Sequence, residues 1–506
     1  MNILLASSEV HPYSKTGGLA DMVGSLGKVL ARAGHRVGLV TPLFPGIRER
    51  CSELKRLGPL PELPLGIHAV RGEVWTLEPV PGLTIYFIDQ PGFYQRAGLY
   101  QHDGIDYPDN AERFLFLAKA VTHLALTLDW QPELVHLNDW QVAFAALYLQ
   151  QHRQEPGHEN APRTCMTIHN LAYQGIFPAS RYVLTNLPWD YFVPSGVEFY
   201  GQMNCLKAGL CYADVLTTVS PRYAREITTP EFGCGLDGLL RERRQSLLGI
   251  LNGVDYDEWN TTRNPYLKYA YSTEDLAGKA ANKAELQREF GLTVDPAIPL
   301  FGSIGRMVEQ KGVDIMLDAL SEMLNANIQF VQVGSGATVF QRAFQELSRR
   351  FPNRAAVRIG FEEALSHRIE AGCDFFLMPS RFEPCGLNQM YSLRYGTIPL
   401  VRATGGLDDT VLDPREDLAR ANGIKFHEYS GRALAKGIRK ALALYATPEL
   451  LHRFRLNAMA ADFSWDRTAT RFVDIYQQTL ESRPADDDSP SALRKGRGPG
   501  VRGPAV

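Results

Sequence analysis

Two copies of the tetrapeptide Thr-Gly-Gly-Leu, at residues 16–19 and 404–407, stand where an apolar run gives way to a helical pattern. Glycines at such a turn let backbone N–H groups approach a phosphate, and the dipole of the following helix favours an anion. Lys15 adds a full positive charge directly before the first copy. A Gly-Gly pair also occurs where a strand simply turns tightly into a helix. The lysine and the repetition favour phosphate binding, with the candidates Gly18, Thr404, Gly405 and Gly406.

Two cations follow another apolar run in the second half of the chain. Arg306 and Lys311 lie in Gly-Arg-Met-Val-Glu-Gln-Lys-Gly, residues 305–312. A guanidinium can hold a phosphate through two N–H groups and an ammonium adds a point charge, as a departing diphosphate requires. An arginine and a lysine five residues apart also fit a solvated helix face. Their position at the end of a strand and before a glycine favours the phosphate site.

A carboxylate, Glu383, lies in Met-Pro-Ser-Arg-Phe-Glu-Pro-Cys-Gly-Leu, residues 378–387, again directly after an apolar run. Presented there, it could bind sugar hydroxyls or stabilise positive charge on an oxocarbenium-like centre. It could equally be a first-turn or capping carboxylate of the next helix. The local sequence leaves both interpretations open.

Two polar clusters follow apolar runs in the first half. His169 and Asn170 end one run, and Asp139 lies in His-Leu-Asn-Asp-Trp, residues 136–140, at the end of another. A lone histidine is more often a packed, hydrogen-bonded core residue than a catalyst. Two such clusters at strand ends favour a site.

The sequence lacks the motifs of several other classes of ligand-binding protein. Residues 333–339 begin like a dinucleotide-binding loop, but Val339 replaces the third glycine. The sequence has no Walker loop, no H-E-x-x-H and no paired Cys/His spacing for zinc. It therefore predicts neither a cofactor nor a metal.

The elements that position these residues follow a regular alternation. Short apolar runs with helical stretches between them predict a parallel sheet covered on both faces. They lie at residues 3–6, 85–88, 134–137, 165–168 and 215–219, and again at 300–304, 328–333, 357–359, 375–378 and 398–401. The sequence thus predicts two α/β domains, each a doubly wound, Rossmann-like parallel sheet, with a ligand in the cleft between them.

Length and charge agree with this division. A chain of 506 residues exceeds one ordinary core. Its 53 Lys and Arg against 56 Asp and Glu leave a net charge of −3, which offers no broad field for nucleic acid or an anionic membrane. No apolar run is long enough for a membrane helix. Seven scattered cysteines predict reduced thiols and a cytoplasmic location.

We expect an N-terminal domain at 1–255, a second domain at 256–465 and a C-terminal helix at 466–481. Residues 482–506 are rich in Pro, Gly, Asp and Arg and nearly devoid of large apolar side chains. Such a segment cannot bury enough surface to offset the entropy of ordering it, so we expect a disordered tail.

With these residues in place, the chain resembles the glycogen and starch synthase family from Met1 to about Leu480. Seven segments carry the likeness in order, at residues 15–21, 136–140, 167–175, 249–259, 305–312, 379–387 and 404–411. The resemblance implies the GT-B fold, in which two doubly wound domains face each other and a C-terminal helix crosses back to the first. Residues 1–255 would form the acceptor-side domain and residues 256–465 the nucleotide-sugar-binding domain. It also implies metal-free transfer of glucose from ADP-glucose to the non-reducing end of an α-1,4-glucan, with retention of configuration.

The resemblance implies roles for individual residues. Glu383 would be the catalytic carboxylate, Arg306 and Lys311 would hold the diphosphate, and Lys15 and Gly18 would contact the phosphate and sugar of the donor. His169 and Asn170 would line the glucose pocket. Further substrate-binding residues would be Asp21, Asp139, Asn252, Phe361, Cys385, Gly386, Leu387, Thr404, Gly405 and Gly406.

Two positions depart from related patterns. Many relatives with this fold carry a second Glu eight residues after the first, where this chain has Tyr391, which favours the glycogen and starch synthase branch. Phe361 stands where a tyrosine often stacks on adenine, and its ring can still stack. The enzymatic alternative is a transferase that uses UDP-glucose or another acceptor. The alternative from another class is a glucan-binding scaffold without activity. The sequence predicts no oligomeric state.

Overall fold

The computed structural model describes residues 1–482, which form two compact units. Unit 1 comprises Met1–Thr217, Gly233–Leu247 and the chain from Ala469 onward, and unit 2 comprises Thr218–Phe232 and Leu248–Thr468. The short segment Thr218–Phe232 was not predicted to be part of unit 2. The boundary predicted after residue 255 is a different division and stays a prediction. The predicted tail lies outside the described residues, except for Ser482.

Unit 1 is built on a nine-stranded sheet with the order β16-β15-β11-β10-β1-β2-β7-β6-β3. Parallel pairs form its centre, and β6 and β3 add an antiparallel edge. The strands are β1 (Asn2–Ala6), β2 (Arg36–Pro42), β3 (Lys55–Pro59), β6 (Glu73–Val80), β7 (Leu83–Asp89), β10 (Leu134–Asn138), β11 (Arg163–Ile168), β15 (Val215–Thr218) and β16 (Leu247–Gly249).

Helices and short strands complete the first half of the chain. Helices are α1 (Gly18–Arg32), α2 (Ile47–Arg50), α3 (Pro91–Tyr94), α4 (Asn110–Thr127), α5 (Phe144–Arg153), η1 (Ala179–Thr185), η2 (Trp189–Tyr191), α6 (Cys205–Tyr212), α7 (Pro221–Glu226), α8 (Asp237–Glu242) and η3 (Arg244–Ser246). Short strands are β4 (Leu63–Leu65), β5 (His68–Val70), β8 (Gln101–His102), β9 (Ile105–Asp106), β12 (Ile176–Pro178), β13 (Glu198–Phe199) and β14 (Gln202–Asn204).

Unit 2 is built on a six-stranded parallel sheet with the order β19-β18-β17-β20-β21-β22. Its strands are β17 (Leu300–Ile304), β18 (Gln329–Gly334), β19 (Ala355–Ile359), β20 (Phe375–Met378), β21 (Ile398–Arg402) and β22 (Ile424–Phe426). Its helices are α9 (Ala277–Glu289), η4 (Glu309–Lys311), α10 (Val313–Met323), α11 (Thr338–Arg350), α12 (Glu363–Gly372), α13 (Asn388–Arg394), α14 (Gly405–Thr410), α15 (Gly431–Tyr445) and α16 (Pro448–Ala460).

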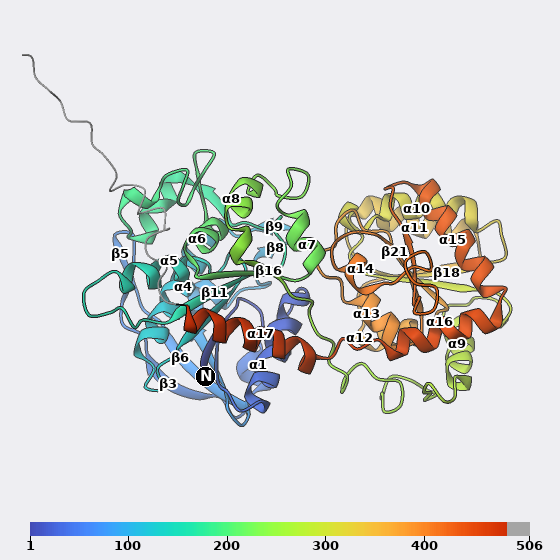
Figure 1. The fold of residues 1–506 in the computed structure, drawn as a ribbon, viewed down its shortest axis with the longest axis horizontal. Helices are drawn as coiled ribbons and strands as arrows, with labels where there is room; N and C mark the ends of the chain where they lie inside the picture. The colour runs from blue at the N-terminus through green and yellow to red at the C-terminus, as the bar shows by residue number, and fades with distance from the viewer. Residues whose placement is uncertain (483–506) are drawn as a thin grey trace, which may run out of the picture. The chain divides into compact units, whose positions relative to one another are not determined.

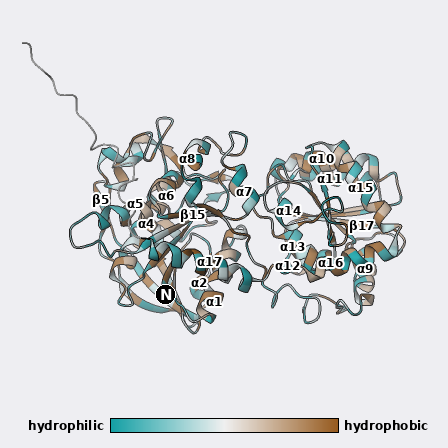
Figure 2. Ribbon diagram, viewed as in Figure 1, coloured by the Kyte–Doolittle hydropathy of each residue, from teal (hydrophilic) through white to brown (hydrophobic). Residues whose placement is uncertain are grey.

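Helices cover both faces of the sheet in unit 2. Figure 1 shows α10 and α11 on one side of its strands and α9 and α12 on the other. Two buried clusters correspond to these faces: Phe301 and Phe375 pack with α10 and α11, and Leu300 and Phe376 pack with α9 and α12. Successive strand residues point to opposite faces, so a strand buried on both sides reads as a continuous apolar run. In Figure 2 the helices carry both brown and teal along their length, as expected for helices with one buried face. The predicted fold class of two doubly wound α/β sheets is confirmed.

Strand order reverses direction once in each of the two sheets. In unit 1, β2 lies on one side of β1 and β10 lies on the other, and in unit 2 the reversal falls between β17 and β20. In open α/β sheets, ligands bind at the carboxyl ends of the strands at such a switch point. The structure therefore points to the loops after β1 and β10 and to those after β17 and β20.

Helix α17 (Trp465–Glu481) begins in unit 2 and belongs to unit 1 from Ala469 onward, which confirms the predicted return of the chain. Its buried Tyr476 hydroxyl lies 2.7 Å from Nδ1 of His136 on β10, and the other ring nitrogen lies 2.6 Å from the Thr167 hydroxyl. Burial lowers the pKa of His136 to about 3, so the ring is neutral at ordinary pH. No helix within residues 1–482 combines the length and apolarity that a bilayer crossing requires.

We predict that Tyr476→Phe lowers the free energy of unfolding of unit 1 by about 1 to 3 kcal/mol, because it leaves a buried nitrogen of His136 unpaired. Urea unfolding measures the loss. The control is Arg471→Gln, at an exposed position of the same helix, which should change the midpoint little. Equal midpoints for both variants would show that the contact contributes nothing.

Candidate active site

The loops after β17 and β20 meet at the switch point of unit 2. Gly312, which ends η4, has φ +69, and a Cβ there would lie 2.0 Å from the carbonyl oxygen of Pro379. Only glycine therefore fits this close approach. The approach brings the Lys311 ammonium within 2.6 Å of the Glu383 carboxylate, whose same oxygen also accepts the Ser380 hydroxyl at 3.0 Å.

Glu383 is buried, with 5% of its surface exposed. Helix α13 begins at Asn388 after the N-cap Leu387, and no side chain caps it. The capping alternative that the sequence left open is therefore excluded for this helix. A buried carboxylate needs a positive or hydrogen-bonding partner, and Lys311 and Ser380 supply both.

The backbone of Glu383 is held by the second Gly-rich loop. Its carbonyl accepts the Gly406 amide at 3.1 Å. Gly405 has φ +46, and a Cβ there would lie 1.9 Å from the same carbonyl oxygen. The loop that follows β21 thus fixes the residue that follows β20.

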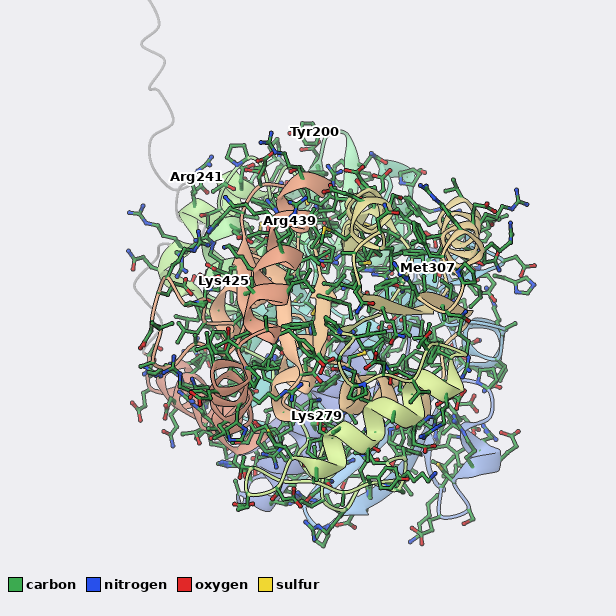
Figure 3. All side chains as sticks on the ribbon, turned by 90° about the vertical axis from the view of Figure 1, so that its right-hand side faces the viewer. Tyr200, Arg241, Lys279, Met307, Lys425 and Arg439 are labelled. Carbon is green, nitrogen blue, oxygen red and sulfur yellow. The ribbon has the colours of Figure 1, made fainter. Side chains whose placement is uncertain are left out.

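A buried glutamate from a distant part of the sequence also binds this loop. The Glu226 carboxylate, at the end of α7, accepts the Gly405 amide at 3.1 Å and lies 3.4 Å from the Thr404 hydroxyl. Glu226 is 7% exposed, and Arg222 Nε donates to it at 3.1 Å. Helix α14, which follows the loop, is held by buried Lys425 (labelled in Figure 3). Its ammonium donates to the carbonyl and the carboxylate of Asp408 at 2.8 and 2.9 Å.

The first Gly-rich loop in unit 1 repeats this arrangement. The Glu9 carboxylate accepts the Thr16 amide, the Thr16 hydroxyl at 2.6 Å and the Gly17 amide at 3.3 Å. The Tyr100 hydroxyl donates to Glu9 at 2.6 Å. In both loops a carboxylate of the chain occupies amides that the sequence analysis offered to phosphate. The Lys15 ammonium, which is partly exposed, donates to Asp21 at 2.7 Å.

Asp139 and His169 follow the neighbouring strands β10 and β11. Asp139 has φ +59, rare for a residue with a side chain, and its carboxylate accepts the His169 amide at 2.7 Å. Nε2 of His169 lies 2.9 Å from the side-chain oxygen of Asn138. Burial and the nearby charge of Glu9 raise the pKa of Asp139 to about 7, and burial lowers that of His169 to about 3. This acid therefore titrates near neutral pH beside a neutral imidazole.

The remaining predicted residues differ in their exposure and in their local contacts. Arg306 is exposed in the loop after β17, and Phe361, beyond β19, has 69% of its surface exposed. The backbone N–H of Asn252 donates a hydrogen bond to the Cys385 sulfur. Burial raises the pKa of this thiol to about 12. Oδ1 of Asn252 is buried and has no hydrogen-bond partner within the described part of the chain. Asn170 accepts the Ala172 amide at 3.1 Å, and Gly386 turns with φ +70 before Leu387.

Four residues of the site were not predicted from the sequence: Glu9, Tyr100, Glu226 and Ser380. Glu9 and Ser380 lie within three residues of the ends of β1 at Ala6 and β20 at Met378, so their position could have identified them. Tyr100 and Glu226 lie in segments without a motif, and their partners are 91 and 178 residues distant. No local pattern identifies such pairs.

Known proteins that are similar to this chain identify its family. Residues 2–242 match the sequence model of the starch synthase catalytic domain, and residues 287–460 match that of glycosyl transferases group 1. A glycogen synthase from Anaeromyxobacter sp. (strain Fw109-5) is 47% identical over 482 residues, which cover 94% of this chain and 99% of that protein. The chain belongs to the glycogen and starch synthase family. A second member, a glycogen synthase from Thioalkalivibrio sulfidiphilus, is 47% identical over 493 residues, covering 95% of this chain and all of that protein.

Solved structures agree with the family. The catalytic domain of starch synthase IV from Arabidopsis thaliana, bound to ADP and acarbose, has a TM-score of 0.86 and 33% identity, covering 95% of this chain and 99% of that one. A sucrose-phosphate synthase from Thermosynechococcus elongatus has a TM-score of 0.59 and 18% identity over 94% of this chain and 98% of that one, which shows a shared fold alone. The chain is a glycosyltransferase, as the sequence analysis predicted.

We predict that Asp139→Asn changes how stability depends on pH. The folded-state pKa of Asp139, about 7, lies above the unfolded value of ~3.9, so protonated Asp139 stabilises the fold below about pH 4. This contribution is lost as pH rises towards 7, by up to about 1.4 kcal/mol per pH unit. The uncharged amide has no such loss. The free energy of unfolding of Asp139→Asn should therefore rise relative to wild type between pH 4 and 7.

Denaturant titrations at several pH values test this expectation. The control is Asp106→Asn, at an exposed position of β9, which should give a nearly constant difference from wild type. A constant difference for Asp139→Asn as well would show that its carboxyl titrates normally.

Proposed function

We propose that the chain elongates an α-1,4-glucan by transferring glucose from ADP-glucose to the non-reducing end, with retention of configuration. Family membership supports this proposal. The single observation that carries it is the Lys311–Glu383 pair, with its 2.6 Å contact at the switch point of unit 2. In the proposal, Lys311 supplies a cation for the leaving diphosphate and Glu383 supplies a carboxylate for the positive charge that develops on the sugar.

In the proposed reaction, the bond between glucose C1 and the diphosphate breaks, and ADP leaves with the electron pair. A new bond forms from C1 to a hydroxyl oxygen of the glucan, and the hydroxyl proton is released. Negative charge grows on the diphosphate, and Arg306 and Lys311 bind it. Positive charge grows on the sugar, and Glu383 stabilises it. Interactions that strengthen as charge develops lower the barrier more than those made equally in the ground state.

Other residues of unit 2 have binding roles in this proposal. The exposed ring of Phe361 stacks on the adenine, and the buried, unpaired Oδ1 of Asn252 binds a sugar hydroxyl. The loop of Thr404, Gly405 and Gly406 has its last two amides occupied by the chain itself, so its main role is to position Glu383. Cys385, Gly386 and Leu387 continue from Glu383 and line the same side of the donor.

Unit 1 contributes its own set. Lys15 and Gly18, which begins α1, bind the phosphate and sugar of the donor, and Asp21 orients the Lys15 ammonium. Neutral His169 and Asn170 bind glucose hydroxyls. Asp139 acts on the acceptor side, where a carboxyl with a pKa near 7 can both accept and donate a proton.

The proposed transfer needs no metal, because cationic side chains meet the phosphate charge. We also propose a cytoplasmic location, in keeping with the free thiols of all seven cysteines in the described chain.

A donor panel tests the function. We expect glucose transfer to glycogen from ADP-glucose, with little from UDP-glucose, and unchanged rates after strong chelation. Turnover with UDP-glucose and none with ADP-glucose would reverse the assigned donor. Transfer from neither nucleotide sugar would favour the glucan-binding scaffold. Loss of activity on chelation, with rescue by magnesium or manganese, would contradict a metal-free reaction.

We predict that Glu383→Gln lowers turnover by about 10² to 10³, because removing a preorganised charge from a buried site costs a few kcal/mol of barrier. The amide keeps the shape and one acceptor, so the melting temperature should stay close to wild type. Turnover and a thermal melt are measured on the same preparation. Glu449→Gln, an exposed glutamate of α16, is the control and should leave both unchanged. A Glu383→Gln variant that melts early yet elongates glucan well would make this residue structural.

A further inference from the structure

We propose a second site, on unit 1, that binds a divalent transition ion such as Zn²⁺ through His152, Glu155 and His158. One ligand atom from each of these side chains lies within 4.8 Å of the others. The proposed transfer reaction does not use this cluster.

The backbone explains why the three side chains meet. They follow the pattern His-x-x-Glu-x-x-His at the end of α5. The Glu155 amide donates to the His152 carbonyl and the His158 amide donates to the Glu155 carbonyl, each at 3.1 Å. Side chains three residues apart eclipse one another in turns of this kind. Gly157, with φ +87, permits the turn that returns His158 to the same face.

The distances fit a coordination site better than hydrogen bonds. Nδ1 of His152 lies 3.4 Å from Oε2 of Glu155, and Nδ1 of His158 lies 3.5 Å from the same oxygen. Both exceed the ~2.7 to 3.2 Å of an ordinary hydrogen bond. Ligands bound at ~2.0 to 2.1 Å to a tetrahedral ion are separated by roughly 3.3 to 3.5 Å. The imidazole rings are stacked, with centroids 4.1 Å apart.

The donor set selects the kind of ion. Two imidazole nitrogens and one carboxylate oxygen suit Zn²⁺ and other late transition ions, and a water can take the fourth position. Mg²⁺ and Ca²⁺ prefer oxygen ligands and should bind poorly. The side chains of His152, Glu155 and His158 are 26, 57 and 48% exposed, so an ion can reach them from solvent.

The position of the site indicates a structural role. The loop between α5 and β11 is anchored on both sides by Asp214, which accepts from Arg153 at 2.9 Å and from Arg163 at 3.1 Å. A bound ion would close the loop between these anchors. The loop enters β11 at its amino end, whereas His169 follows the carboxyl end of that strand. Binding should therefore stabilise unit 1 without changing glucose transfer.

The test compares the full chain with the double variant His152→Asn/His158→Asn. Calorimetric titration with Zn²⁺ should show one more bound ion in the wild type than in the double variant. Co²⁺ should give the intense visible absorption of tetrahedral coordination with the wild type only. Zn²⁺ should raise the melting temperature of the wild type but not that of the variant, and Mg²⁺ should raise neither.

The matched control is His102→Asn, because His102 is an exposed histidine 3.5 Å from a carboxylate, Asp103, without a second imidazole in the cluster. It should bind Zn²⁺ as the wild type does. Melting in the presence of chelator verifies that each variant is folded, and if the double variant is not, the single variant His158→Asn replaces it. Equal Zn²⁺ stoichiometry and affinity in the wild type and the histidine variant would overturn the proposal. Weak binding with octahedral Co²⁺ spectra in both would also overturn it.

Discussion

The close approach of the two loops that carry Lys311 and Glu383 is the constraint on which the candidate site in unit 2 depends. A carboxylate that is 5% exposed is stable only if a cation and donors surround it. Meeting that need requires adjacent parallel strands to end side by side, which β17 and β20 do where strand order reverses. It also requires a glycine at 312, because a side chain there would separate the two loops. The ion pair therefore depends on the order of the strands and on the turn at Gly312.

A second theme is that the chain supplies anions to its own Gly-rich loops. Glu9 and Glu226 are nearly buried, and each binds amides at the start of a helix that follows a strand of the sheet, α1 after β1 and α14 after β21. A helix start favours negative charge, so an internal carboxylate stabilises the loop before any substrate arrives. The two loops share their sequence and this buried partner. Their glycines therefore serve loop shape and close packing as much as ligand contact.

Much of the fold and part of the site could be predicted from the sequence, for a physical reason. Lys311, Glu383, Asp139 and His169 each follow an apolar run, and the carboxyl ends of parallel strands gather at one edge of a sheet. A residue's position just after a strand can be read from the local sequence, and it indicates that the residue lies at the edge of the sheet where ligands bind. The pairing of Glu226 with Gly405 has no such signal, because it depends on how a segment of residues 218–232 joins unit 2. Whether Glu383 caps the next helix depends on where α13 begins. The sequence does not determine that start to a single residue.

The division of the chain into units also has a consequence for biosynthesis. The backbone passes between the units after residues 217, 232, 247 and 468, so neither unit is continuous in sequence. As the polypeptide leaves the ribosome, unit 1 gains most of its sheet first, yet the hydroxyl that pairs with His136 arrives only with α17. Unit 2 is synthesised in full, through Thr468, before the part of that helix that belongs to unit 1 emerges. The first unit to appear is therefore the last to be completed, and its unfinished surface has to be kept from aggregation for most of translation.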